Sequence, residues 1–361
     1  MHETTDVENG ENDKKSGWIK GCFAVVLVLG VLSALVFVGL LVFGITAVLM
    51  GETETPDGSV PLREVRVSGV EEDPKVAVIP LEGMIYGSAG ESGGRTPLQI
   101  TRARIEKAAQ DPQVRGVMLK VDSPGGGITA SDILHEELEQ LRAGGEGKPV
   151  VVNMMDMATS GAYYVSAAAD SIIAHPTTLT GSIGVMMPLY DATELMDKIG
   201  VESKSLTTGP YKDLGSPFVE KSEKQREKER ELLQDLIDQM YERFLEVVAS
   251  GRDMEMENVR EVADGRIFTS ETAREVGLID EVGYESRAVE EIKDLCEVEE
   301  VQLVEYRRVL SMADVLAAFA QGGEVSLNLS PEFNPLNAAR PMYLWLPRTS
   351  HYSDSDFPEE L

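Results

Sequence analysis

The sequence predicts an α/β protein in which a layered domain with largely parallel strands follows a single membrane anchor. Two observations lead to this prediction: short apolar runs alternate with helical patterns along the middle of the chain, and one long uncharged segment lies near the N-terminus. Alternating strands and helices are typical of parallel sheets covered by helices. With 361 residues, 42% of them hydrophobic, the chain is long enough for one large domain or two medium ones.

The predicted anchor is a transmembrane helix over residues 22–50, which carry no charge. This segment exceeds the roughly 20 apolar residues that a helix needs to cross a membrane. A cleaved signal peptide is the alternative, but the apolar segment is long for one and no A-x-A cleavage site follows it. Three lysines precede the segment and the acidic stretch GETETPDG follows it. We therefore expect a single-pass protein of the cell membrane, with residues 1–21 in the cytoplasm and the main domain outside it.

The next part of the chain divides into a spacer and a core domain. Residues 51–75 are rich in Glu, Asp, Gly and Pro and are interpreted as a solvated linker. The core is expected over residues 76–310. It contains four apolar runs that are predicted to be buried strands: VAVIPLEGMI from Val76, GVMLKVD from Gly116, PVVVNMM from Pro149 and SIIAHP from Ser171.

Two helices follow from apolar residues at helical spacing. The stretch ASDILHEELEQLR presents an apolar face made of Ile133, Leu134, Leu138 and Leu141. A longer helix is predicted from about Glu220 to Ser250, with apolar residues at Leu233, Ile237, Met240, Phe244 and Val248. Its charged start, KSEKQREKER, is interpreted as a solvated surface, and a partner-binding helix is the alternative.

Charge and cysteine content narrow the classes of function. The chain has 33 basic and 62 acidic residues, a formal net charge of −29. Such a surface repels a polyanion, so we expect no nucleic-acid partner. The only cysteines, Cys22 and Cys296, imply no disulfide framework.

The stretch VDSPGGGITASDI places three glycines between an expected strand and an expected helix. Backbone N–H groups at such a junction suit an oxyanion. The phosphate-loop pattern G-x-x-x-x-G-K-[ST] is absent. A plain strand-to-helix turn remains the alternative.

Ser160, in DMATSGAYYVSAAAD, follows a predicted strand and stands at or near the start of a helix. A hydroxyl there suits a nucleophile, because the helix N-terminus favours developing negative charge. A serine in this place is also a common helix N-cap. The surrounding residues do not form the G-x-S-x-G elbow of other hydrolases.

A serine nucleophile requires a base, and the four histidines are poor partners. His2 and His351 lie near the chain ends, His135 falls on the surface-looking side of its helix, and only His175 is credible.

A lysine is the other option, since a neutral amine accepts a proton. Lys212, in TTGPYKDLGSPF, has Gly, Pro and Tyr before it and a Leu-Gly-Ser-Pro loop after it, although a surface-loop lysine remains the alternative. Four other lysines are expected to be solvated, namely Lys198, Lys204, Lys221 and Lys224.

Five motifs, in order, resemble the signal peptide peptidase A family, whose members are serine-lysine peptidases of the Clp protease and crotonase superfamily. They are VDSPGGG, DMATSGAYYVSAAAD, TLTGSIGV, YKDLGSPF and ADGRIFTSETAREVGLIDEVG. The resemblance covers roughly residues 76–306 and includes the single N-terminal anchor of the short bacterial form. It implies a Clp protease/crotonase-like layered spiral of ββα units.

The resemblance also implies residue roles. Ser160 would be the nucleophile, Lys212 its general base and Ser182 the hydroxyl that orients the lysine. The N–H groups of Gly126 and Gly161 would form the oxyanion hole. No metal or organic cofactor is implied.

Substrates and assembly follow from the same resemblance. We expect remnant signal peptides and other apolar peptides as substrates, and a homo-oligomeric ring or dome in which the lysine reaches a serine of the neighbouring chain. A crotonase-like acyl-CoA enzyme and an inactive membrane scaffold are the alternative functions. In the C-terminal extension, residues 311–361, the block PMYLWLP is either a strand packed on the oligomer or a segment that docks in the substrate groove.

Overall fold

The computed structural model describes residues 29–30, 32–40, 60–87, 95–144, 147–309 and 342–344. The chain divides into two units, Met1–Pro61 with Leu310–Glu324 and Leu62–Val309 with Val325–Leu361. In the first unit, residues 29–30 and 32–40 are helical. Within the described ranges no helix has both the length and the apolar character to cross a membrane. Most of the predicted anchor, residues 22–50, lies outside those ranges, so the anchor stays a prediction.

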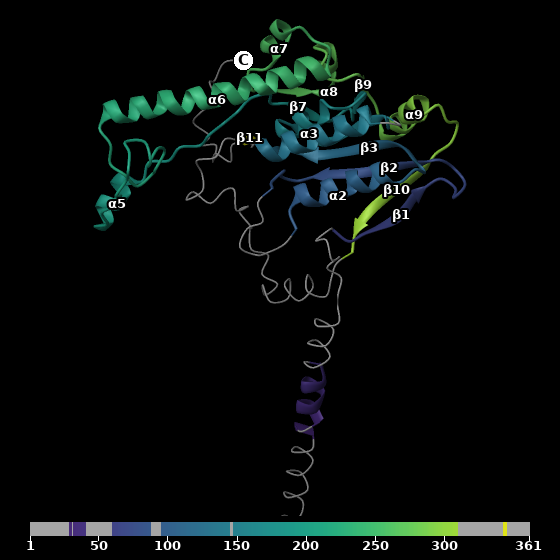
Figure 1. Cartoon of the computed structure of the whole chain (residues 1–361), viewed down its shortest axis with the longest axis horizontal. Helices are drawn as coiled ribbons and strands as arrows, with labels where there is room; N and C mark the ends of the chain where they lie inside the picture. The colour runs from purple at the N-terminus through teal and green to yellow at the C-terminus, as the bar shows by residue number, and fades with distance from the viewer. Residues whose placement is uncertain are drawn as a thin grey trace, which may run out of the picture. The chain divides into compact units, whose positions relative to one another are not determined.

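A nine-stranded sheet runs through the described part of the second unit (Figure 1). Its main path is β1 (Leu62–Ser68), β10 (Gln302–Arg308), β2 (Lys75–Glu82), β3 (Val114–Ser123), β5 (Val150–Thr159), β6 (Ser171–Ala174) and β9 (Glu281–Val282). Along this path every pair is parallel except β1 with β10. β7 (Leu179–Gly181) pairs parallel with β5, and β8 (Ile267–Thr269) pairs antiparallel with β7. The α/β class and the four predicted strands, now β2, β3, β5 and β6, are confirmed.

Both faces of the sheet are buried, because helices pack on each of them. Alternate residues of the central strands point to opposite faces and so enter different apolar clusters. In β2, Ile79 belongs to the larger apolar cluster and Val78 to the second one. α2 (Pro97–Gln110) and α3 (Ile128–Ala143) pack into the larger cluster, whereas α9 (Glu285–Leu295) packs into the second. For this reason the sequences of the central strands are nearly continuous apolar runs.

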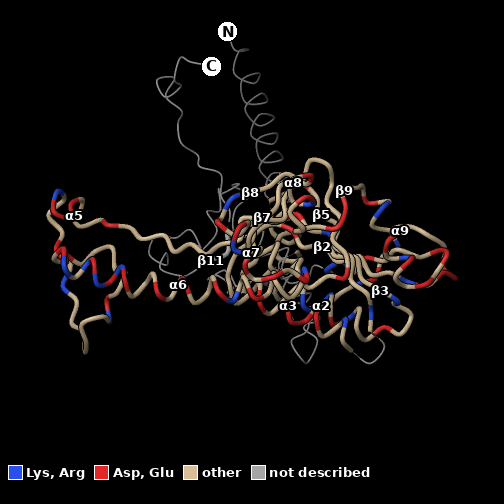
Figure 2. Tube along the Cα trace, turned by 90° about the horizontal axis from the view of Figure 1, so that it is seen from above, with Lys and Arg blue, Asp and Glu red and all other residues tan. Residues whose placement is uncertain are grey.

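The long predicted helix is α6 (Glu223–Gly251), and its buried residues lie between Leu233 and Val248. It begins at a capping box in which the Ser222 backbone N–H donates to Gln225 Oε1 at 3.0 Å. Its buried residues begin at Leu233, and α5 (Thr193–Ile199) has none. Residues 186–232, which we call the arm, extend beyond the sheet in both views (Figures 1 and 2). α7 (Met256–Val262) and α8 (Ser270–Glu275) lie between α6 and β9 in the chain.

Two expectations from the sequence about the sheet domain are wrong. The predicted linker, residues 51–75, includes strand β1, which pairs with β10. Its charged residues suit an edge strand with one solvated side, and this made the segment look like a spacer. His135 is also not at the surface, since it is only 4% exposed.

Candidate active site

Ser160 is the single residue between β5 and α4 (Gly161–Ser166), and its backbone is strained. Its φ of 54° and ψ of −118° are rarely adopted by a residue with a side chain, at a typical cost of about 1–3 kcal/mol. Two backbone hydrogen bonds hold this geometry: Ser160 N–H donates to the Gly181 carbonyl oxygen at 2.7 Å, and Tyr164 N–H donates to the Ser160 carbonyl oxygen at 2.9 Å. The strand–turn–helix arrangement of a nucleophile elbow is thus present without the G-x-S-x-G sequence.

The Ser160 hydroxyl does not cap the helix. It makes no side-chain cap hydrogen bond, although the residue is only 1% exposed. Among the described residues, Ser160 Oγ has no hydrogen-bond partner, and the same holds for the neighbouring Thr159 Oγ1. A buried hydroxyl without a partner costs about 1–3 kcal/mol. Strain and an unsatisfied hydroxyl in one residue therefore favour the nucleophile interpretation over the N-cap.

Ser182 lies next to Ser160. Strand β7 runs parallel to β5, with Gly181 opposite Thr159, so the carbonyl that accepts the Ser160 N–H belongs to the residue just before Ser182. Ser182 also has a positive φ, 51°, and its N–H donates to the Arg266 carbonyl oxygen at 2.8 Å. Two of the five predicted site residues thus meet at the C-terminal end of β5.

The glycine motif forms β4 (Gly125–Gly127), which follows β3 and lies near α4. Gly126 must be a glycine, because a Cβ there would lie 2.0 Å from the Ile85 carbonyl oxygen. The glycine thus allows a close approach between β4 and the backbone of Ile85. Gly161 is the first residue of α4, so its N–H has no intrahelical acceptor. The glycine strand and the start of α4 bring both predicted oxyanion donors to the end of the sheet that carries Ser160.

A strand near the C-terminus lies beside the glycine strand and α4. β11 (Met342–Leu344) pairs antiparallel with β4, with Tyr343 opposite Gly126. It also lies near α4, the helix that Ser160 precedes. An extended segment beside the glycine strand occupies the kind of position that a peptide takes when it adds a strand to a sheet edge.

Lys212 is not brought to Ser160 within one chain. It is exposed, and its backbone N–H donates to the Gly209 carbonyl oxygen at 3.3 Å in a turn of the arm. His175 makes no hydrogen bond to Ser160 Oγ, which has no partner among the described residues. Its Nδ1 lies 2.8 Å from Thr177 Oγ1, and its ring packs edge-on against Tyr284 at 4.9 Å. Across the described ranges, Ser160 Oγ therefore has no base beside it.

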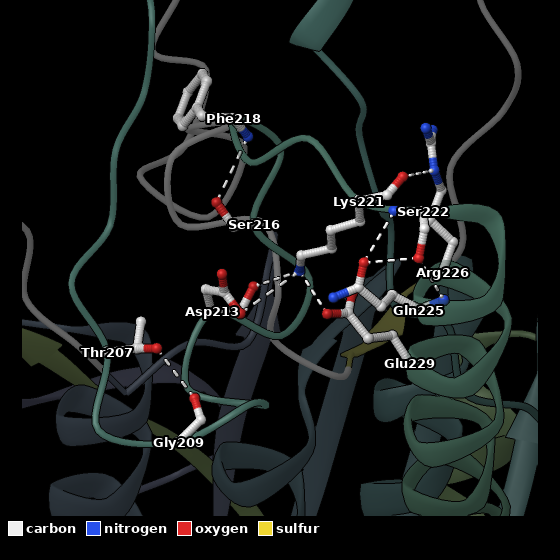
Figure 3. A network of polar contacts seen from close by, with 10 residues as sticks. All are labelled: Thr207, Gly209, Asp213, Ser216, Phe218, Lys221, Ser222, Gln225, Arg226 and Glu229. Carbon is white, nitrogen blue, oxygen red and sulfur yellow. Dashed lines mark hydrogen bonds and ion pairs between the residues drawn. The ribbon is translucent and has the colours of Figure 1, made fainter.

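The side chain of Lys221 is largely buried, which the sequence did not reveal. Its side chain is 8% exposed and contacts Asp213 and Glu229 (Figure 3). The polar run KSEKQREKER concealed it, because nothing in the spacing shows that the preceding loop folds back over this side chain.

Helix α4 is anchored by its two tyrosines. The Tyr163 hydroxyl donates to the Leu278 carbonyl oxygen at 2.7 Å, and burial raises the pKa of Tyr163. The Tyr164 hydroxyl donates to Asp132 Oδ1 at 2.5 Å, and its ring lies 5.3 Å from that of His135. Burial lowers the pKa of His135, and the nearby carboxylates, Glu139 foremost, offset this in part. Both tyrosines fix the orientation of the helix behind Ser160.

Known proteins resemble this chain over its α/β domain. Residues 142–299 match the model of peptidase family S49. A protein of Methanocaldococcus jannaschii that carries a protease name is 38% identical over 237 residues, 64% of this chain and 74% of that protein. An Enterococcus faecium protein named for signal peptide peptidase SppA is 33% identical over 237 residues, 64% of this chain and 67% of that protein. Protease 4 of Salmonella typhi is 34% identical over 241 residues, 67% of this chain and 38% of that protein.

The shared domain and its relatives define a peptidase. The chain belongs to the signal peptide peptidase A family, peptidase family S49. The family resemblance that the five motifs indicated is confirmed.

Proposed function

We propose that this chain is a membrane-anchored serine endopeptidase with a Ser160–Lys212 dyad, and that it degrades remnant signal peptides and other apolar peptides at the membrane. The observation that carries the proposal is Ser160 itself: a strained backbone at a strand–helix junction and a buried hydroxyl without a partner among the described residues. Strain and unsatisfied polar groups of this kind cluster at functional sites.

The proposed mechanism is acyl transfer. The neutral Lys212 amine takes the proton of Ser160 Oγ, and the oxygen attacks the peptide carbonyl carbon. The N–H groups of Gly126 and Gly161 donate to the oxyanion, with about 2.7–4 kcal/mol of transition-state stabilisation for each donor. The lysine then gives its proton to the leaving amine, and water hydrolyses the acyl-enzyme. Ser182, beside Ser160, is placed in this scheme as the hydroxyl that orients the lysine.

Lys212 is proposed to act on Ser160 of a neighbouring copy of the chain. The exposure of Lys212 on the arm supports this, as does the absence of a base beside Ser160 among the described residues of one chain. The arm also exposes large apolar side chains that a second copy would cover: Leu195, Ile199, Leu206 and Tyr211.

The remaining parts of the proposal concern the fold and the place of action. The α/β domain is proposed to be a Clp protease/crotonase-like spiral of ββα units. A transmembrane helix over residues 22–50 would hold it at the cell membrane, with the domain outside the cytoplasm. A peptidase tethered there meets signal peptides where they remain after cleavage.

The test is turnover of leucine- and alanine-rich peptides by the purified full chain. Ser160→Ala and Lys212→Ala should each abolish turnover while the far-ultraviolet circular dichroism spectrum stays that of the parent chain. Lys198→Ala, an exposed lysine of the same arm, is the matched control and should retain full activity. Parent-level turnover by either dyad variant would reject the mechanism.

A further inference from the structure

The loop that follows Lys212 is tied to α6 by the buried Lys221. Lys221 Nζ donates to the Asp213 carbonyl oxygen at 2.8 Å and lies 2.5 Å from Glu229 Oε1 (Figure 3). The Asp213 carboxylate lies 3.8 Å from the same nitrogen. One ammonium group thus joins the residue directly after Lys212 to an early turn of α6.

We propose that Lys221 and Glu229 are positioning residues, which hold the backbone of Lys212 so that its amine reaches the nucleophile. This inference rests on the proposed Ser-Lys dyad. The Asp213 carbonyl accepts a second hydrogen bond, from Ser216 N–H at 3.0 Å, so the peptide plane between Asp213 and Leu214, one residue beyond Lys212, is held from two directions. A base must lie within hydrogen-bond reach of the proton it takes, and a displacement of about 1 Å can lower the rate about 10²-fold.

Burial distinguishes this ion pair from the others on the same helix. The Lys221 and Glu229 side chains are 8% and 12% exposed, whereas those of Lys228 and Glu231 are 54% and 61% exposed. Exposed pairs contribute little. Loss of the Lys221 cation would leave the carboxylates of Asp213 and Glu229 close together with little water around them. The loop after Lys212 would then have to open so that water could reach them.

The arm has further internal ties that do not involve Lys221 Nζ. Arg226 Nε donates to the Lys221 carbonyl oxygen at 3.1 Å, and Arg226 Nη1 donates to Asp191 Oδ2 at 2.7 Å (Figure 3 shows the first of these). Ala192 N–H donates to the Pro217 carbonyl oxygen at 2.8 Å. Because the buried residues of α6 begin only at Leu233, a change at Lys221 is expected to loosen the loop and to leave the sheet domain folded.

The experiment compares four variants of the full chain in peptide turnover. Lys221→Met and Glu229→Gln should lower kcat by about 10–100-fold and leave KM unchanged. Lys221→Arg keeps the charge and the donors and should recover most of kcat. Lys228→Met, which removes the exposed pair, is the matched control and should match the parent chain. Hydrogen exchange should become faster in the peptide that contains Ser216 in Lys221→Met and Glu229→Gln, and should stay at the parent rate in Lys228→Met.

Two results would overturn the proposal: parent-level kcat in Lys221→Met despite faster exchange, or a loss of kcat that Lys221→Arg does not recover. If Lys221→Met loses its folded spectrum, Glu229→Gln still tests the pair, because a neutral amide keeps the side-chain shape. Failure of the dyad is a separate result. Parent-level turnover by Lys212→Ala rejects the proposed function, whereas an inactive Lys212→Ala beside a fully active Lys221→Met rejects only the positioning role.

Discussion

Ser160 combines two local costs that a structural residue would avoid. The backbone on its two sides is fixed by the hydrogen bonds to Gly181 and from Tyr164, so the positive φ is imposed by the end of β5 and the start of α4. The hydroxyl is buried with no partner in the described part of the chain. Ser166, six residues later on the same helix, differs: its Oγ donates to the Ala162 carbonyl oxygen at 2.8 Å. The comparison separates a buried hydroxyl that is hydrogen-bonded within its helix from one that has no partner among the described residues.

The two serines should respond oppositely to truncation. Ser160→Ala removes an unsatisfied buried hydroxyl and should raise the free energy of unfolding by about 1 kcal/mol. Ser166→Ala removes a satisfied hydroxyl and should lower it by a similar amount. Ser160→Gly also relieves the positive φ, against a glycine entropy cost of about 0.5–1 kcal/mol, and should be at least as stable as the parent chain. Denaturant unfolding of the purified chains measures the free energy of unfolding for all three variants. A Ser160→Ala chain less stable than the parent would contradict the view that the buried Ser160 hydroxyl is unsatisfied.

His135 makes a pH-dependent contribution to stability. Burial lowers its pKa from the ordinary value of 6.5. Below about pH 6.5 the unfolded chain therefore binds this proton more readily than the folded one, and stability falls as the pH falls. Asp132 and Glu139 face the ring and act against this effect, whereas Arg243 adds to it. His135→Phe keeps a ring against Tyr164 and should flatten the fall of the unfolding free energy between pH 7 and pH 5. An equally steep fall in that variant would assign the dependence to other groups.

At the scale of elements, the strands that the sequence predicted best are those buried on both faces. β2, β3, β5 and β6 are nearly continuous apolar runs, because each strand packs into both clusters. β1 was missed because an edge strand has one solvated side, which gives it the composition of a linker.

Some residues of the candidate site could be located from the sequence, and others could not. The motifs located Ser160, Gly126 and Ser182 in sequence, but the positive φ at two of them is a tertiary feature without a local signal. Lys221 was missed since its burial depends on a loop that folds back across the start of α6, and helical periodicity carries no information about such a loop.

The C-terminal strand is expected to restrain the candidate site that it lies beside. β11 pairs with the glycine strand at Gly126, where an extended substrate would have to pair. A chain that ends at Ala339 lacks β11 and should turn over peptides faster, whereas a chain that ends at Leu344 keeps the strand and is the matched control. Initial rates with a short peptide measure the difference. Equal rates for the two truncated chains would show that β11 leaves the substrate site open.

At the scale of the whole molecule, Lys212 is exposed on the arm, which extends beyond the sheet domain (Figure 1). Charged residues of both signs lie along α5 and the start of α6 (Figure 2), and exposed apolar side chains lie beside them on the arm. The net charge of −29 opposes self-association by long-range repulsion, so the proposed contact between copies would depend on short-range burial of such apolar groups. An assembly of this kind would place the arm of one chain over the strand end of the next.

Mixing two inactive chains tests this arrangement directly. Ser160→Ala retains Lys212, and Lys212→Ala retains Ser160, so a junction between the two chains holds one complete dyad if the lysine acts on its neighbour. Random assembly from equal amounts should then restore about a quarter of the parent turnover, because about one junction in four pairs the intact serine with the intact lysine. The control mixes Lys212→Ala with the double variant and should stay inactive. Co-purification of differently tagged chains shows that mixed assemblies have formed. Mixed assemblies without turnover, alongside an active parent chain, would place both members of the dyad within one chain and require the arm to fold back onto its own domain.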